Sequence, residues 1–343
     1  MNHTNNFTAL RWFAAGLVLY GHSFVFLGLP EPLFLQWIPL GTLGVYVFFA
    51  ISGFLVTQSW ESDPHAFRFI YRRALRIFPG LWVCIALSIF PFGAWLTTLD
   101  LGAYLKHPVT WHYFSNVYLY ITYHLPGVFE QARIPYAVNG SLWSLPAEFF
   151  MYMLLAFLGL LKAPRVISLI LFIAFVLAIL FWASKTSEML VIYRTDFRQV
   201  VICGAYFLAG SVIFKYRLLR FVSPGNLLLL AVGWLCLSRW HDAFVLGSYL
   251  VLPFFVLALG TANTPVLARM SRHDYSYGIY IYAFPIQQAV VHLFPSIGLW
   301  AYLAFCSLLV IVCAALSWYL VEKPFLQFKP QRRLAVIDHR QEA

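Results

Sequence analysis

Residues 9–29, ALRWFAAGLVLYGHSFVFLGL, decide the fold, because this apolar stretch has about the length that crosses a bilayer as a helix. Two ionisable residues interrupt it, Arg11 and His22. Eleven residues at about 100° each make about three turns plus roughly 20°, so both side chains are predicted to lie on one helix face, about 16 Å apart along the axis. An ionisable group in hydrocarbon costs roughly 2.5 to 3.5 kcal/mol on insertion scales. The pair is therefore a candidate functional site.

The composition extends the membrane assignment to the whole chain. The 343 residues are 62% hydrophobic and only 10% charged, whereas soluble proteins carry about 25% charged residues. We expect an all-α polytopic membrane protein with about ten transmembrane helices. The apolar windows are residues 8–28, 38–58, 74–94, 143–162, 165–183, 198–215, 221–239, 243–262, 274–293 and 297–320.

The lysines and arginines predict the orientation in the membrane. If the N-terminus is cytoplasmic, 17 of the 23 basic residues fall in inside segments, which favours both termini in the cytoplasm. The net charge of +10 then reflects topology and needs no nucleic-acid partner. We expect residues 1–326 to form the transmembrane domain and residues 327–343 a short basic cytoplasmic tail. The first segment is expected to be a retained helix and not a signal peptide, with no soluble domain appended at either end.

Cysteine and histidine spacing predicts neither a disulfide framework nor a bound metal. All five cysteines fall within the predicted spans, and no spacing typical of metal ligands is present.

The segment FRFIYRRALRIFPG, residues 67–80, enters the third predicted helix from the cytoplasmic side. Arg73 and Arg76 are three residues apart and therefore share a face. The positive-inside rule alone would explain them; alternatively, their guanidinium groups form a site for phosphate at the inner mouth of a cavity. Arg11 likewise has two interpretations, a membrane-interface anchor or part of such a site.

One carboxylate lies within a predicted span, that of Glu148 in NGSLWSLPAEFFMYMLL, residues 139–155. This helix runs from outside inward, which places Glu148 near the depth of His22. A carboxylate there can orient an imidazole, accept a hydroxyl proton or be paired for structure only. On the second helix, Ser52 and Gly53 are better explained by close helix packing. The aromatic residues of segment 95–142 fit either sugar stacking or an interfacial belt.

Taken in order, these runs resemble the acyltransferase 3 family of integral-membrane sugar O-acyltransferases. The matching motifs span nearly the whole chain and are more specific together than singly. They are Arg11 and His22 with ten residues between them, FFAISGFL at 48–55, Arg73 and Arg76 before Pro79, SLWSLPAE at 141–148, DYSYGIYIYAFP at 274–285 and SWYLVEKPF at 317–325.

The resemblance implies transfer of an acyl group, most often acetyl, from a cytoplasmic acyl-CoA co-substrate to a hydroxyl of a glycan or glycolipid acceptor across a bacterial inner membrane. It implies functional roles for His22, Arg11, Arg73 and Arg76, and Glu148 matches the acidic residue of the family's fourth-helix motif. The chain departs from many members at Ala283, where they carry a histidine, so no role is assigned to that position.

A mechanism follows as a hypothesis. The phosphates of coenzyme A would bind Arg11, Arg73 and Arg76, and a pantetheine arm on the order of 15 to 20 Å would bring the thioester beside His22. His22 would act as general base or form an acyl-histidine intermediate, and Glu148 would orient its ring or bind the sugar.

A transporter or proton-coupled permease, with His22 and Glu148 as a relay, is the alternative from another class of protein. It is disfavoured because no internal repeat is visible. A purely structural role would leave the buried polar groups without a purpose. The sequence does not identify the acceptor, the acyl chain length or the oligomeric state.

Overall fold

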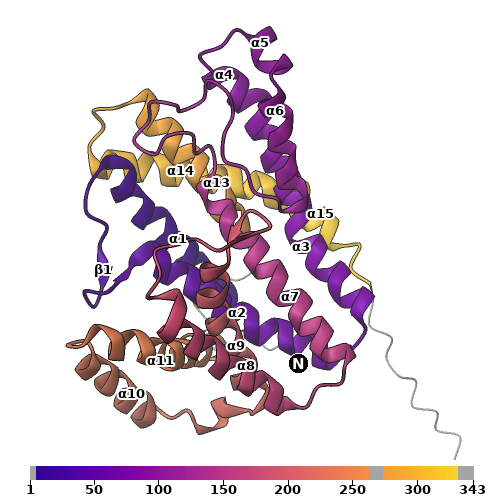
Figure 1. Ribbon diagram of the computed structural model, residues 1–343, viewed down its shortest axis with the longest axis vertical. Coiled ribbons are helices and arrows are strands. Elements are labelled where there is room, and N and C mark those ends of the chain that lie inside the picture. Colours follow the sequence, from indigo (N-terminus) through magenta and orange to yellow (C-terminus); the bar gives the residue numbers. More distant parts are fainter. Residues whose placement is uncertain (1–4, 263, 265–266, 268–272, 331–343) are drawn as a thin grey trace, which may run out of the picture.

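The computed structural model describes residues 5–262, 264, 267 and 273–330, and it confirms an all-α multi-pass architecture (Figure 1). Within these residues, the strands form only two short antiparallel hairpins. One pairs β1 (Leu33–Phe34) with β2 (Ile38–Pro39), and the other pairs β3 (Val191–Ile192) with β4 (Thr195–Asp196).

The helices follow the predicted windows closely. The α-helices are α1 (Phe7–Leu27), α2 (Leu40–Ser62), α3 (Ala66–Leu87), α4 (Ala94–Leu96), α5 (Leu101–Lys106), α6 (Pro108–His112), α7 (Ser144–Leu160), α8 (Arg165–Ala178), α9 (Phe197–Lys215), α10 (Pro224–Leu237), α11 (His241–Thr261), α13 (Ser276–Leu293), α14 (Leu299–Ser317) and α15 (Lys323–Leu326). Short 3₁₀ and π segments extend several of them: η1 (Ser88–Gly93), η2 (Tyr113–Tyr118), η3 (Gly140–Trp143), η4 (Ile179–Ala183), η5 (Leu218–Phe221) and η6 (Trp318–Glu322).

All ten predicted windows are helical, but not all are long and apolar enough to cross a membrane. Eight helical stretches meet that condition within the described part of the chain. The other two are α10, which has only 14 residues, and α13, which carries the buried amides of Gln287 and Gln288. Orientation of the termini stays a prediction. Residues 331–343 of the expected tail lie outside the described residues, and so do five of the arginines counted as cytoplasmic: Arg269, Arg272, Arg332, Arg333 and Arg340.

Helix α2 lies at the centre of the bundle, because it packs against both α1 and α9. Glycines permit the close approach. A Cβ at Gly44 would lie 2.4 Å from the Ala14 carbonyl oxygen of α1, and one at Gly53 would lie 1.9 Å from the Phe207 carbonyl oxygen of α9. The small-residue packing expected for Gly53 is thus confirmed.

Burial separates central from peripheral helices. The apolar windows of α2 and α9 are 67% and 72% buried, whereas those of α8 and of the α14–α15 stretch are 22% buried and face outward. Figure 1 shows the α10 and α11 pair at one end of the long axis and α4 to α6 at the other. The polar side chains described next lie between these ends, among α1, α2, α3, α7 and α13.

Candidate active site

A cavity of about 380 Å³ lies among α1, α2, α3, α7 and α13 and is lined by an excess of basic side chains. We call it the arginine cavity. Five basic and two acidic residues line it: Arg11, Arg72, Arg73, Arg76 and Lys329 against Glu148 and Asp274. Such an arrangement favours an anionic ligand, because each guanidinium offers several donors in a fixed plane.

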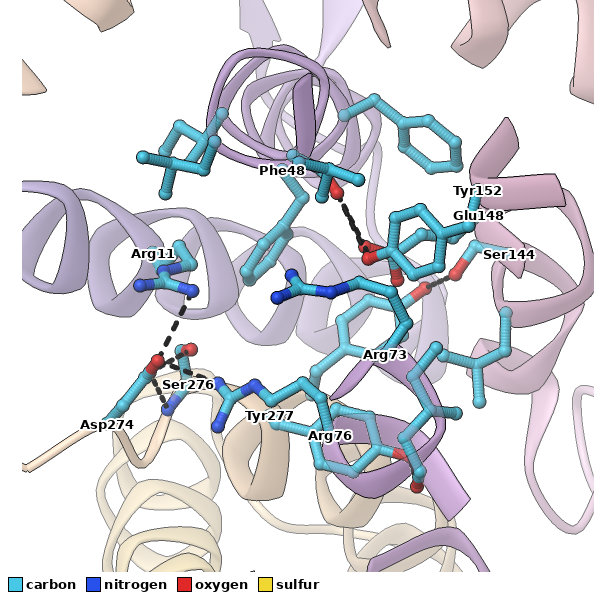
Figure 2. A pocket seen from close by; sticks show the side chains of 18 of the residues that line it. Arg11, Phe48, Arg73, Arg76, Ser144, Glu148, Tyr152, Asp274, Ser276 and Tyr277 are labelled. Carbon is cyan, nitrogen blue, oxygen red and sulfur yellow. Dashed lines mark hydrogen bonds and ion pairs between the residues drawn. The ribbon is translucent and has the colours of Figure 1, made fainter. Parts of the chain in front are cut away.

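The three arginines expected to bind a donor converge in this cavity (Figure 2). Arg73 and Arg76 project from the same face of α3, and Arg11 approaches from α1. The Arg11 side chain is 26% exposed and is paired with Asp274 within the cavity. The cavity also contains Lys329, which follows α15, so the beginning of α1 and the end of the described chain lie on the same face of the bundle.

Asp274 neutralises two of these arginines. Its Oδ2 is 2.7 Å from Arg76 Nη2 and 3.3 Å from Arg11 Nη1, and its Oδ1 accepts from the Ser276 hydroxyl at 2.5 Å. Burial alone would raise the pKa of Asp274, but Arg11 and Arg76 lower it to about 2. Glu322 adds a second carboxylate, 3.6 Å from Arg76 Nη1. Asp274 is therefore ionised at neutral pH and fixes Arg11 against Arg76.

The other two arginines of the cavity differ sharply in their partners. Arg72 is held by Asp63, whose Oδ2 lies 2.7 Å from Arg72 Nη1. Hydrogen bonds from Arg68 and Arg72 lower the pKa of Asp63 well below its usual range. Arg73 takes part in none of the ion pairs formed by the described residues, and its buried Nε has no hydrogen-bond partner among them. Among the four arginines that line the cavity, Arg73 is the one without an ion pair to a described residue, so it can bind a ligand without breaking one.

Lys329 shows how strongly cationic the cavity is. Burial lowers the pKa of Lys329, as do Arg76, Arg73, Arg11 and Arg72, to about 8. A bound anion would have the opposite effect and favour the ammonium form.

Glu148 also lines the arginine cavity, and it lies away from the predicted partner. Its Oε1 accepts a hydrogen bond from the Ser52 hydroxyl at 3.0 Å and a very short one from the Tyr152 hydroxyl. The Ser52 and Tyr152 hydroxyl oxygens are themselves 3.1 Å apart. The structure therefore joins Glu148 to Ser52 and Tyr152, and it does not bring Glu148 and His22 together.

His22 lines a second cavity of about 340 Å³, which we call the histidine cavity. Thr42, Tyr46, Trp143 and Gln199 line it as well. The imidazole packs edge-on against Phe284, with ring centroids 5.6 Å apart, and its buried Nδ1 has no hydrogen-bond partner within the described residues. The two cavities meet at Val45 and Tyr280, which line both.

Sequence reasoning missed part of this site. Asp274 opens the DYSYG run used for the resemblance, and an acidic residue beside two tyrosines at a helix start was a usable signal. Ser52 was interpreted as a packing residue, although its hydroxyl bonds Glu148. Lys329 was assigned to the short basic cytoplasmic tail, yet it lines the cavity.

Together these features define a class: an integral multi-pass membrane protein with a cationic internal cavity that adjoins a histidine-lined one. The model of the acyltransferase domain of the acyltransferase 3 family matches residues 4–319. The chain therefore belongs to this family and is a membrane-embedded O-acyltransferase.

Two relatives are similar over nearly their full length. An "O-acetyl transferase" of Shigella phage Sf6 is 30% identical over 338 residues, covering 95% of this chain and 97% of the relative. "Nodulation protein 10" of Rhizobium leguminosarum bv. viciae is 29% identical over 369 residues, covering 97% of each chain. No solved structure matches the chain significantly.

Proposed function

We propose that this protein transfers an acetyl group from acetyl-CoA, bound on the cytoplasmic side of a bacterial inner membrane, to a hydroxyl of an extracytoplasmic glycan. The observation that carries the proposal is the pair of adjoining cavities, one rich in arginine and the other lined by His22. The name of the phage relative supports acetyl as the acyl group.

The donor would bind through its phosphates in the arginine cavity. Guanidinium groups bind phosphate through charge-assisted, often bidentate hydrogen bonds. Arg73, which lacks a carboxylate partner among the described residues, would contribute most, and Arg11, Arg76 and Lys329 would assist. The amide groups of the pantetheine arm would then face the Ser52, Glu148 and Tyr152 group. In this proposal, Glu148 acts on the donor side.

Transfer would occur beside His22. The imidazole removes the proton from the acceptor hydroxyl, and the oxygen attacks the thioester carbonyl. The carbon–sulfur bond then breaks, the ester forms, and the thiolate of coenzyme A takes the proton from His22. The His22 imidazole is thus returned to its neutral form. The buried Nδ1 has no hydrogen-bond partner among the described residues, so in this proposal no carboxylate assists the ring from that side.

The test is acyl transfer in membranes that contain the intact chain, using radiolabelled acetyl-CoA and the envelope glycans of the expression host. His22→Ala is expected to abolish labelling of glycan, a loss of about 10² to 10⁴ in rate. His292→Ala is the matched control, because His292 is exposed near the end of α13 and outside both cavities.

The outcomes separate the alternatives. Transfer that survives His22→Ala at equal expression would exclude His22 as the base. Label that crosses the membrane without entering glycan would favour a transporter. No product from any acyl donor would exclude the proposed activity.

A further inference from the structure

We propose that the histidine cavity binds one neutral sugar residue of the acceptor glycan. Its ligands are the hydroxyl groups of Thr42 and Tyr46, the amide of Gln199 and the indole of Trp143. The inference rests on the proposed function and deepens it, because it names the class of sugar whose hydroxyl reacts beside His22.

The polar side chains of this cavity have unused hydrogen-bonding capacity. Five of them form no side-chain hydrogen bond with any described residue, and each is half-buried: His22, Thr42, Tyr46, Trp143 and Gln199. Polar groups that are partly withdrawn from water lose free energy unless another group pairs with them. A ligand that carries several hydroxyl groups suits this lining, since each hydroxyl can both donate and accept.

The α2 side of the cavity is held in place by packing. Thr42 and Tyr46 are four residues apart and share one face of the helix. The Tyr46 ring is stacked on Tyr206 of α9, with centroids 4.2 Å apart and an interplanar angle of 20°, and the Tyr206 hydroxyl lies 2.7 Å from that of Ser248. The ring of Tyr46 is therefore fixed, and its hydroxyl is left for a ligand.

Trp143 adds an aromatic ring at the end of η3. Two contacts fix this segment against α13. The Ser141 carbonyl oxygen accepts a hydrogen bond from Tyr280 at 3.0 Å, and a Cβ at Gly140 would lie 2.5 Å from the Phe284 ring. An indole offers a large apolar surface with one N–H donor. The carbon-bound hydrogens of a sugar ring can pack on that surface while its hydroxyl groups reach polar neighbours.

The charge of the lining favours a neutral sugar. Among the described residues that line the cavity there is no carboxylate, ammonium or guanidinium group, and a charge buried without a counter-charge is costly. A carboxylate lies close by, because Glu31 Oε1 accepts a hydrogen bond from the Gly41 amide at 2.8 Å and Gly41 lines the cavity. An anionic sugar would be repelled by Glu31.

The size of the cavity fits a single residue. Its volume of about 340 Å³ lies at the lower end of the range of ligand pockets, about 300 to 1,000 Å³. The rest of the glycan would remain outside. The chemistry of one sugar residue, and not the overall charge of the glycan, would therefore decide acceptance.

The experiment uses the intact chain in nanodiscs, radiolabelled acetyl-CoA and glycans extracted from the envelope of the expression host. The labelled glycan is cleaved to its smallest labelled fragments, and mass spectrometry identifies the residue that carries the acetyl group. We expect a neutral sugar. Label on a sugar residue that bears a carboxylate, a phosphate or a free amine would overturn the proposal.

Variants test the assigned ligands. Gln199→Leu and Thr42→Val each remove one hydrogen-bonding group and should raise the apparent KM for glycan by about 2- to 12-fold. The kcat and the calorimetric affinity for acetyl-CoA should not change, whereas a general disturbance of the fold would alter all three. Gln58→Leu is the matched control, because Gln58 is exposed on α2 and lines neither cavity. Tyr46→Phe keeps the stacking on Tyr206 and tests the site even if the other two variants fold poorly.

The results separate this site from the activity itself. If the intact chain acetylates glycan but Gln199→Leu, Thr42→Val and Tyr46→Phe all show the KM of Gln58→Leu, the acceptor site is wrongly placed and the acyltransferase stands. If the intact chain labels no glycan, the proposed function fails, and the acceptor site fails with it.

Discussion

Replacement of Arg73 by glutamine should weaken donor binding without weakening the fold. Arg73 lines the arginine cavity, but it forms no ion pair and its Nε has no hydrogen-bond partner among the described residues. Arg72, by contrast, is bound to Asp63, and Arg11 and Arg76 share Asp274. Arg73 can therefore bind a phosphate without breaking an ion pair to a described residue.

The expected loss of donor affinity is that of one charge-assisted hydrogen-bonding group. Hydrogen bonds to charged groups contribute about 1.5 to 3 kcal/mol, which corresponds to about 10- to 150-fold in affinity at 1.4 kcal/mol per tenfold. The stability of the unliganded protein should not fall with the substitution. An unpaired, partly buried charge is costly to desolvate, so Arg73→Gln should leave the melting temperature unchanged or raise it.

The assay is calorimetric titration of the purified protein in nanodiscs with acetyl-CoA, together with a thermal melt of the unliganded protein. Arg198→Gln is the control, because Arg198 is paired with Asp196 and does not line the arginine cavity. An affinity for acetyl-CoA within twofold of the intact chain would refute the reasoning. A large fall in melting temperature would also refute it, since it would make Arg73 a structural residue.

Three other changes have defined outcomes. Lys329 has a pKa of about 8, so it is an ammonium below about pH 8 and loses its charge above it. The affinity for acetyl-CoA should therefore be highest below about pH 8 and fall as the pH rises through that value. Lys329→Gln should flatten this pH dependence in titrations from about pH 7 to about pH 9. Gly53→Ala places a methyl group against the Phe207 carbonyl oxygen and should lower the free energy of unfolding by about 1 to 3 kcal/mol in chemical unfolding. Gly16→Ala is the control, because a Cβ there has no neighbour within 4 Å and should cause no measurable loss of stability. Asp274→Asn removes the negative charge that Arg11 and Arg76 share, and it should destabilise the protein by about 3 kcal/mol. Because the phosphates of coenzyme A can replace that charge, added coenzyme A should raise the melting temperature of the variant more than that of the intact chain.

Local sequence was sufficient for the helices because hydrocarbon leaves the backbone few options. An apolar run of about 20 residues must satisfy its amide and carbonyl groups internally, and only a helix does this within one segment. All ten windows are helical for that reason. The prediction of which helices cross the membrane was less accurate for α13, which packs against other helices. Two of its glutamines donate hydrogen bonds to other segments, Gln287 to the Leu19 carbonyl oxygen and Gln288 to the Ile134 carbonyl oxygen.

Sequence spacing predicted that Arg73 and Arg76 share a helical face, and both line the arginine cavity, but it did not predict that Arg72 lines the cavity as well. Depth along a helix, however, does not determine neighbours. Glu148 was predicted near His22 from depth alone, but α7 directs its carboxylate to Ser52 and Tyr152, on the other side of the Val45 and Tyr280 junction.

The sequence by itself thus determined the membrane class, the helical segments and the polar positions that each helix turns inward, because these depend on hydropathy and on the 3.6-residue period. Only the tertiary structure decided which charges meet. Asp274 is far in sequence from Arg11 and Arg76, and its contacts with them arise from the packing of α13 against α1 and α3. The two cavities likewise arise from packing, because Val45 of α2 and Tyr280 of α13 line both of them and a cavity is a property of packed surfaces and not of any one helix.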